Sequence, residues 1–584
     1  MTATASASAS APKDGQNRNG EASEGMVESA PVSTADAAGN TKQFSLTSSE
    51  LHGFKLYMVL IGVCFGAFVM ALDVYVIGTA IPSITSDFQN TSHISWYPAA
   101  YTLAVCSLTP LAGKMASVFS LRWVYQGFFF VFLVGSAICG WASTSEVFIV
   151  GRAVSGIGAA AVTSGGLTVV LTISSPQRRP LYIGLCSSCF ALGLILAPII
   201  GGAFTEKVTW RWCFWINLPG GAITLLAMFF FFKLPQREGE PSTTMKKILS
   251  LDLVGSFVFV PGIFMLILAL QWGGNSYPWK SATIIGLLVG SIVMLCLFGV
   301  WESRLGDSAM IPGVLVTRRT ILLSVIFSFC HLGALSVSSY YLPEWFQAVQ
   351  GASPFESGIR VLPSVISQIV GTICAGAIAL KIRFYNPWFY IGPVLMCTAA
   401  ALYTQFTVSN TPSSQWIGFQ VIQGLGVGFS MQMPSLMVQL ALKDRADLLP
   451  IGVSLNIFAQ FLGATVAQVI AGAIFHARLE SQLASRAALS HDQIQLLYRS
   501  GIANVRAIVD KYFPTLFDPI MESYNSAIAQ THFVAVASAG VAFFLAFGIE
   551  WIRIEGSAIK LGNQDNVESA NPRSEEKPSG ATEH

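Results

Sequence analysis

The strongest constraint on this chain is its succession of long apolar runs. A run of about 20 apolar residues is long enough to cross a bilayer as a helix. Backbone inside lipid must satisfy its own hydrogen bonds, which favours helices. The sequence therefore predicts an all-α polytopic membrane protein with fourteen transmembrane helices, near residues 54–83, 96–112, 123–142, 147–173, 181–204, 212–233, 252–271, 281–301, 320–349, 358–380, 388–406, 415–441, 449–477 and 530–554.

The composition agrees with a membrane protein. Of the 584 residues, 53% are hydrophobic and only 11% are charged, whereas charged residues make up about 25% of a soluble domain. The sequence has no P-loop, hydrolase signature or metal-ligand cluster, and its basic residues form no patch suited to nucleic acid. We therefore expect no enzyme, no cofactor, no metal and no nucleic-acid partner.

The apolar runs fall into blocks separated by polar segments. Internal repeats of this kind are typical of transporters, whose substrate sites lie near the midplane between two halves. A weak echo between Gly113–Trp123 and Gly376–Trp388 supports two halves. The predicted division is a disordered tail at 1–50, a first six-helix bundle at 51–233, a linker at 234–251, two extra helices at 252–301, a second six-helix bundle at 320–554 with an extracellular loop at 479–529, and a disordered tail at 555–584. Within the loop we expect short amphipathic helices.

The basic residues predict the orientation. Loops on the cytoplasmic side of a membrane carry an excess of Lys and Arg. With the N-terminus inside, the short inner connections hold Lys114, Arg122, Arg178, Arg179, Lys233, Arg237, Lys246, Lys247, Arg304, Arg318, Arg319, Lys381, Arg383, Lys443 and Arg445, and the outer ones only Lys207, Arg211, Lys280 and Arg360. Both termini are therefore predicted to be cytoplasmic. The outer side then includes a glycosylation sequon at Asn90, too close to the membrane for us to expect its use.

A stripe of small residues follows in the fifth run. Gly193, Ala197 and Gly201 are spaced four apart, so a helix would carry them on one face, and small side chains let membrane helices approach closely. Pro198 and Gly202 are expected to interrupt that helix. The stripe predicts a seam where two membrane helices pack or pivot, although packing alone would also explain it.

This segment resembles the antiporter motif of the major facilitator superfamily. Trp210-Arg211-Trp212 and Asn217-Leu218-Pro219, which follow it, are similar to the fourteen-span drug:proton antiporter branch and its fungal toxin-efflux members. The resemblance covers about Phe54 to Glu555. It implies a major facilitator fold of two six-helix bundles plus two peripheral helices, and a monomeric, proton-coupled exporter of toxins, secondary metabolites or drugs in the plasma membrane.

Two ionisable residues are candidates for proton coupling. Charged side chains in spanning helices are costly and usually serve a function. Asp73 lies in the first run, in a segment similar to the branch's first-span signature, and Arg152 begins a segment that resembles the superfamily's R-x-x-q-G-x-g-a motif, with Ser155 in place of the usual glutamine. Asp73 either carries a proton or fixes helix packing. Arg152 either assists proton transfer or is a structural charge.

A second resemblance concerns the connection after the second run. Gly113, Lys114 and Arg122 match the superfamily's gating-loop motif, G-x-x-x-D-R-x-G-R-K, but Ser117 stands where aspartate is usual and Ser120 where glycine is usual. This puts the charge latch of the motif in doubt. The two basic residues are also explained by the cytoplasmic position of the loop alone.

The remaining candidates would line a substrate cavity. Glu344 stands where the relatives usually carry an apolar residue, so it either binds a cationic substrate or a proton, or lies at the outer water boundary. The uncharged candidates are Gln423, Gln432, Asn456 and Gln460. A mostly apolar cavity with a few polar points suits amphipathic molecules, although amides also bond helix to helix.

Two alternatives to an exporter at the cell surface stay open at this stage. One is a vacuolar or siderophore carrier of the same fold. The other is a membrane receptor or sensor that does not transport. The polar tails are short for signalling domains, and the presence of Asp73 and Arg152 favours a working carrier.

Overall fold

The computed structural model describes residues 53–89, 93, 96–175, 178–233, 244–274, 277–408, 411–500 and 505–554. The predicted tails at 1–50 and 555–584 and the sequon at Asn90 lie outside these residues. Within the described ranges the regular elements are all helices, as the cost of unpaired backbone groups in lipid requires.

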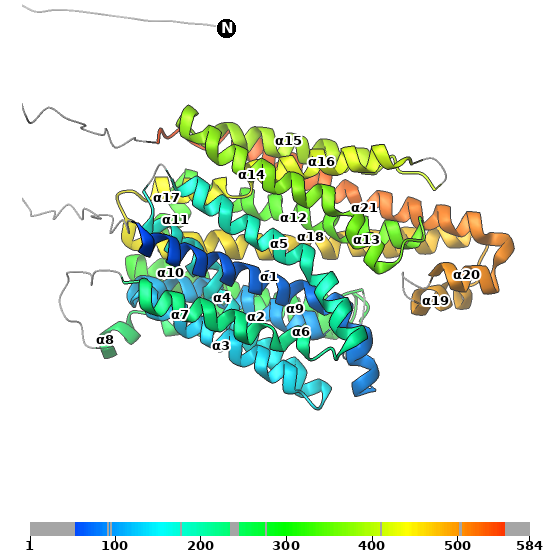
Figure 1. Ribbon diagram of the computed structural model, residues 1–584, viewed down its shortest axis with the longest axis horizontal. Coiled ribbons are helices and arrows are strands. Elements are labelled where there is room, and N and C mark those ends of the chain that lie inside the picture. The colour runs from blue at the N-terminus through cyan, green and yellow to red at the C-terminus, as the bar shows by residue number, and fades with distance from the viewer. Residues whose placement is uncertain are drawn as a thin grey trace, which may run out of the picture. The chain divides into compact units, whose positions relative to one another are not determined.

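The helices follow one another in the order expected from the apolar runs (Figure 1). The first group is α1 (Phe54–Phe88), α2 (Trp96–Val118), α3 (Leu121–Trp141), α4 (Ser145–Ile173), α5 (Arg179–Lys207), α6 (Trp212–Trp215) and α7 (Asn217–Phe231). Then come α8 (Thr244–Leu249), α9 (Leu253–Trp272), α10 (Ala282–Leu305), the 3₁₀ turn η1 (Gly306–Ser308) and α11 (Gly313–Thr317).

The rest of the chain forms a second long series of helices. It consists of α12 (Arg319–Ala348), α13 (Pro354–Arg360), α14 (Leu362–Ile382), α15 (Asn386–Tyr403), α16 (Ser413–Ser430), α17 (Met433–Ala441), η2 (Ala446–Leu448), α18 (Leu449–Arg486), α19 (His491–Ser500), α20 (Val505–Tyr512), η4 (Pro514–Leu516) and α21 (Phe517–Ala546). Two breaks fall at prolines: Pro363 and Pro434 stand near the starts of α14 and α17, where the missing N–H costs nothing.

Twelve segments of the described chain are long and apolar enough to cross a membrane. Helices α2 and α15 are not among them. Helix α2 contains Lys114 and several hydroxyl residues, and the apolar stretch of α15 is diluted by Asn386, Pro387 and Pro393. The protein is therefore a multi-pass membrane protein, and the count of fourteen spans stays a prediction.

The region predicted as a loop at 479–529 is mostly helical. Helix α18 continues to Arg486 and α21 begins at Phe517, so both helices extend into the segment that the sequence predicts to be extracellular. The extensions bury Leu479 and Leu483 in one apolar cluster with Ile520 and Tyr524. The expected short amphipathic helices are present as α19 and α20.

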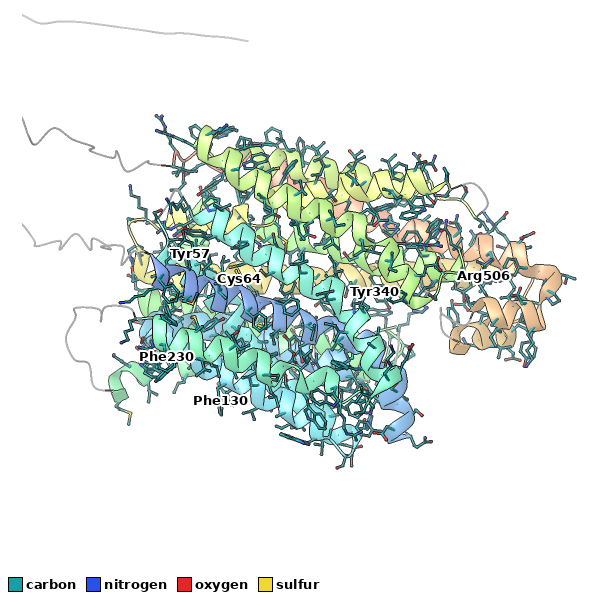
Figure 2. The ribbon with its side chains drawn as sticks, in the orientation of Figure 1. Tyr57, Cys64, Phe130, Phe230, Tyr340 and Arg506 are labelled. Carbon is teal, nitrogen blue, oxygen red and sulfur yellow. The ribbon has the colours of Figure 1, made fainter. Side chains whose placement is uncertain are left out.

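Helices α19 and α20 are held to the second series of helices by buried apolar side chains and by a hydrogen bond from an arginine. Ile494, Leu497 and Val505 are buried. Arg506 of α20, labelled in Figure 2, donates from Nη1 to the carbonyl of Val349 at 3.1 Å. This bond ties α20 to the end of α12.

The packing joins helices within and across the two series. Helix α4 packs against α2 and α3, and α5 packs against α1; in the second series α12 packs against α18 and α21, and α16 packs against α14 and α15. Helix α9 packs against both α10 and α2. Contacts of α2 with α18 and of α5 with α14 connect the two series.

The closest approach of α12 and α18 depends on a glycine. A Cβ added at Gly463 would lie 2.0 Å from the carbonyl oxygen of Phe329 and 2.8 Å from its Cα. These are backbone atoms, which cannot rotate away as a side chain can. A methyl group at this position would force the two helices apart.

We therefore expect Gly463→Ala to lower the free energy of unfolding by about 1–3 kcal/mol, the usual cost of overpacking. Thermal unfolding of the detergent-purified protein measures it. Gly540→Ala in α21 is the matched control, since a Cβ there meets nothing within 4 Å. Equal midpoints for the two variants would contradict the expectation.

Candidate functional site

The structure brings Asp73 and Arg152 together. Arg152 Nη1 of α4 lies 2.7 Å from Asp73 Oδ2 of α1, and the two side chains are 1% and 0% exposed. A buried ion pair is retained only with good geometry and further hydrogen bonds, because both ions lose their hydration. The two candidates that the sequence analysis chose separately therefore form one site.

Further donors and acceptors complete this pair. Asn217 Nδ2 of α7 donates to Asp73 Oδ1 at 2.8 Å, and the same nitrogen lies 3.2 Å from Ser136 Oγ of α3. Arg152 Nε donates to the carbonyl of Tyr97 at 3.2 Å. The guanidinium carbon stands 4.6 Å from the centre of the Tyr101 ring, a cation–π distance.

The sequence analysis did not choose Asn217 as a site residue. It used Asn217 only as part of the motif that marks the branch. The signal that would have found it is a polar side chain inside the apolar run 212–233, because a fully buried amide needs a partner.

Small residues allow α4 to pack closely against α2 and α3, and this close packing buries Arg152 between the helices. A Cβ added at Gly135 of α3 would lie 2.2 Å from the backbone nitrogen of Ser155, and one at Gly156 would lie 2.5 Å from the carbonyl of Tyr101. Ser155 is fully buried, and its hydroxyl has no hydrogen-bond partner among the described residues. At this position the close approach to α3 favours a short side chain.

The stripe on α5 packs against α1. Cβ atoms added at Gly193 and Gly201 would lie 2.6 Å from the carbonyl of Phe68 and 2.2 Å from Thr79 Oγ1, and Ala197 is fully buried. The predicted interruption was wrong, because α5 runs unbroken through Pro198 and Gly202. Gly202 faces open space, so only the residues spaced by four form the seam.

Asp87, Trp210 and Arg211 fasten one end of this group of helices, which we call the Trp210 end. Trp210 Nε1 and Arg211 Nη1 donate to Asp87 Oδ2 at 3.2 and 2.8 Å. Arg211 also donates to the carbonyl of Ala142 at 3.1 Å. The tryptophan and arginine of the motif thus tie the end of α1 to the connection between α3 and α4.

The gating-motif residues lie at the opposite end, which we call the Lys114 end and which the sequence predicts to be cytoplasmic. Gly113 and Lys114 belong to the last turns of α2, because the helix continues to Val118 rather than ending near 112. A Cβ at Gly113 would lie 1.8 Å from Ser454 Oγ of α18. Arg122 donates to the carbonyl of Phe229.

Lys114 has backbone partners rather than a carboxylate of its own motif. Its Nζ donates to the carbonyls of Ser308 and Ala309 at 3.1 and 2.7 Å, and the residue is only 5% exposed. Ser117 instead bonds within its helix, to the carbonyl of Lys114 at 2.8 Å. In this structure the Lys114 ammonium is therefore bound by backbone carbonyls of a distant segment and not by the residue at position 117.

Glu344 lies one turn beyond Tyr340 on α12 (Figure 2). Its Oε2 is shielded from solvent and lacks a hydrogen-bond partner among the described residues, although the residue as a whole is half-buried. The hydroxyls of Tyr340, Tyr341 and Tyr524 interact electrostatically with the carboxylate. Tyr340 is 52% exposed, so this group adjoins open space.

The uncharged candidates differ in their surroundings. Gln423 is buried and accepts a hydrogen bond from Tyr403 at 2.5 Å. Asn456 is fully buried, donates to Ser435 at 2.8 Å and accepts from Ser328 at 2.6 Å. These two amides bond helix to helix.

Gln432 and Gln460 are only half-buried. Gln432 donates to Ser187 of α5 at 2.5 Å, which joins the break between α16 and α17 to the first series.

A groove on α13, α14 and α16 is lined by none of these candidate residues. It measures about 630 Å³ and is lined by Ile359, Leu362, Pro363, Ile366, Ser367, Val370, Val421 and Leu425. Several of these are exposed apolar side chains on α14 and α16, and none of the candidate site residues is among them. This groove therefore carries no argument for the substrate site.

Comparisons with known proteins agree on one family. Residues 63–468 match the profile described as Major Facilitator Superfamily. The chain is similar to the MFS-type transporter poxA of Penicillium oxalicum, with 38% identity over 96% of this chain and 100% of that protein. It is also similar to the Aspyridones efflux protein of Neocamarosporium betae, with 37% identity over 87% of this chain and 90% of that protein. The Rubrofusarin-specific efflux pump aurT of Gibberella zeae is 38% identical over 86% of this chain and 91% of its own length.

Solved structures agree on the fold. The proton:xylose symporter XylE bound to 6-bromo-6-deoxy-D-glucose superposes with a TM-score of 0.54, covering 86% of this chain and 97% of that one at 14% identity. A crystal structure of double tryptophan mutants of XylE gives a TM-score of 0.55, covering 85% and 96% at 14% identity. At this identity the match concerns the arrangement of helices and not the substrate.

The ion pair makes a prediction about stability. We expect Arg152→Met to destabilise the protein by about 3–5 kcal/mol, because it leaves the Asp73 carboxylate buried without its cation. The double variant Asp73→Asn/Arg152→Met should regain a large part, since no charge is then buried. Unfolding midpoints in detergent test this, and a double variant less stable than Arg152→Met would contradict it.

Proposed function

Because this chain belongs to the major facilitator superfamily of membrane transporters, we propose that it exports a hydrophobic or amphipathic small molecule in exchange for protons. The observation that carries the proposal is the buried pair of Asp73 and Arg152, with Asn217 as a third member. Ionisable groups inside membrane helices mark ion and proton pathways. This pair joins α1, α4 and α7 at one point.

The substrate class is inferred from the relatives. Two of them are named as efflux proteins, for aspyridones and for rubrofusarin. By analogy, this chain would export a fungal toxin, a secondary metabolite or a drug of similar character. Its half-buried amides Gln432 and Gln460 are the polar candidates for the cavity, whereas Gln423 and Asn456 are better assigned to helix packing.

Proton coupling would act through Asp73. A proton on its carboxylate removes the charge that attracts the Arg152 guanidinium at 2.7 Å. Arg152 would then keep its bond to the Tyr97 carbonyl and its contact with Tyr101, while Asn217 could still bond to the neutral acid. Protonation would thus loosen α1 from α4 without leaving either group wholly unpartnered.

Alternating access would move one half of the chain against the other. The two six-helix bundles at 51–233 and 320–554 are the moving bodies in this proposal. The close contacts of α2 with α18 near Gly113 and Ser454, and of α5 with α14 near Gly184 and Thr372, lie toward the Lys114 end. They suit a state that is closed at that end.

We further propose that the protein is a monomer in the plasma membrane with both termini in the cytoplasm. The excess of Lys and Arg in the short connections at the Lys114 end supports this orientation. Direct localisation of a tagged chain would separate the plasma membrane from the vacuole.

Export is tested by intracellular accumulation of fungal metabolites and fluorescent drugs in a pump-deficient yeast that expresses this chain. We expect lower accumulation than in the empty strain, and a protonophore should abolish the difference because it removes the proton gradient. Cells that express the Asp73→Asn variant at the same level should accumulate the compounds to the same extent as the empty strain. Full protonophore-sensitive export by Asp73→Asn would exclude Asp73 as the proton site.

Glu344 is the second residue to test in this assay. Its carboxylate has a shielded, unpartnered oxygen next to the exposed Tyr340, so we expect Glu344→Gln to change the rate or the substrate preference of export. The matched control is Glu356→Gln, which removes a carboxylate on α13 that pairs with Arg360. An unchanged rate and preference in Glu344→Gln would remove Glu344 from the site.

A further inference from the structure

The partner of Lys114 is the starting point. Its ammonium group is held by the carbonyls of Ser308 and Ala309 at 3.1 and 2.7 Å. These carbonyls belong to the segment 306–311, which follows α10, the second of the two extra helices. A buried ammonium must be hydrogen-bonded, so this distant segment supplies what the gating motif itself lacks.

Two carboxylates at the ends of the extra helices hold the segment in place. Asp252, just before α9, accepts from Gly255 N at 2.9 Å, from Trp301 Nε1 at 2.8 Å and from Met310 N at 3.2 Å. Glu302 of α10 accepts from Met310 N at 3.1 Å and Ile311 N at 2.8 Å. The two carboxylates thus bind the backbone of the segment at Met310 and Ile311.

One carboxylate of the segment and the two that hold it also act on the lysine. Asp252, Glu302 and Asp307 all interact electrostatically with the Lys114 ammonium. The carbonyls therefore make the hydrogen bonds, and the carboxylates around them supply the opposite charge. Both kinds of partner come from outside the gating-motif segment.

The segment also reaches the second half of the chain. Arg445, in the connection before α18, lies 3.4 Å from Asp307. Next to it, Arg318 Nη1 donates to Asp444 Oδ1 at 2.7 Å and holds the pKa of Asp444 below its usual range. The carbonyls of Ser308 and Ala309 therefore contact α2 of the first half, and Asp307 contacts the connection before α18.

We propose that the segment 306–311, held by Asp252 and Glu302, is a latch that keeps the Lys114 end closed by fastening α2 to the connection before α18. Lys114 is a positioning residue in this latch. The two extra helices would then have a role in gating rather than a merely peripheral one. The interpretation of the closed end as one state of a transport cycle rests on the proposed function, but the latch itself can be tested without transport.

The test measures how often the Lys114 end opens. Thr372 of α14 is 6% exposed and packs against Gly184 of α5, so a cysteine there reacts only when the two helices separate. We would place Thr372→Cys in a Cys374→Ser background and follow labelling by N-ethylmaleimide with peptide-resolved mass spectrometry, without substrate or proton gradient. Adding Lys114→Met should raise the labelling rate about tenfold, on the scale of losing hydrogen bonds from a charged donor.

Three further variants make the result specific. Lys114→Arg should keep the slow rate, because it retains the charge and the donors. Lys381→Met, which removes an exposed lysine at the corresponding end of α14, should also keep it. Asp252→Asn should raise the rate, and the double variant Lys114→Met/Asp252→Asn should react no faster than the faster single one, since both break the same latch.

An unchanged labelling rate in Lys114→Met, at equal expression, would overturn the proposal. A double variant whose rate increase equals the product of the two single increases would overturn it as well. Measuring efflux in parallel separates the two hypotheses. Expected labelling without any export would contradict only the proposed function, whereas export with unchanged labelling would contradict only the latch.

Discussion

The ion pair of Asp73 and Arg152 is the interaction on which the centre of the first half depends. A guanidinium in the membrane interior has to be matched by a carboxylate and by further acceptors. The chain meets this need from four helices, with Asp73 on α1, Tyr97 and Tyr101 on α2, Arg152 on α4 and Asn217 on α7. The packing of these four helices therefore depends on one charge pair, so protonation of Asp73 would affect all of them.

Close packing makes such coupling effective. Where Gly135, Gly193 and Gly463 stand, neighbouring backbones approach so closely that a Cβ would meet backbone atoms at under 3 Å. Without a hydrophobic driving force between helices in lipid, this contact is the main attraction between them. In the proposed transport cycle such closely packed pairs would move as bodies, and the few polar residues of the segment 306–311 and its partners would set closure at the Lys114 end.

Family and site differ in how far the sequence predicted them. The order of the helices and the family follow from the apolar runs and short motifs, since both depend on residues close in sequence. The pairing of Asp73 with Arg152 does not, because 79 positions separate them. The same separation in sequence hid the role of Asn217. It also left open whether Gln423 and Asn456 line a cavity or bond helix to helix; in the structure each bonds to a neighbouring helix.

The sequence by itself determined that this is an all-α membrane protein of the major facilitator superfamily with charged residues in its spanning helices, because length, hydropathy and local motifs are properties of short segments. Only the tertiary structure decided which groups meet. It brought Lys114 to the carbonyls of Ser308 and Ala309, which are 194 and 195 positions away, and left Glu344 with an unpartnered oxygen. Helix packing across the whole chain determines which groups become partners of a buried polar side chain, and a local sequence pattern does not contain that information.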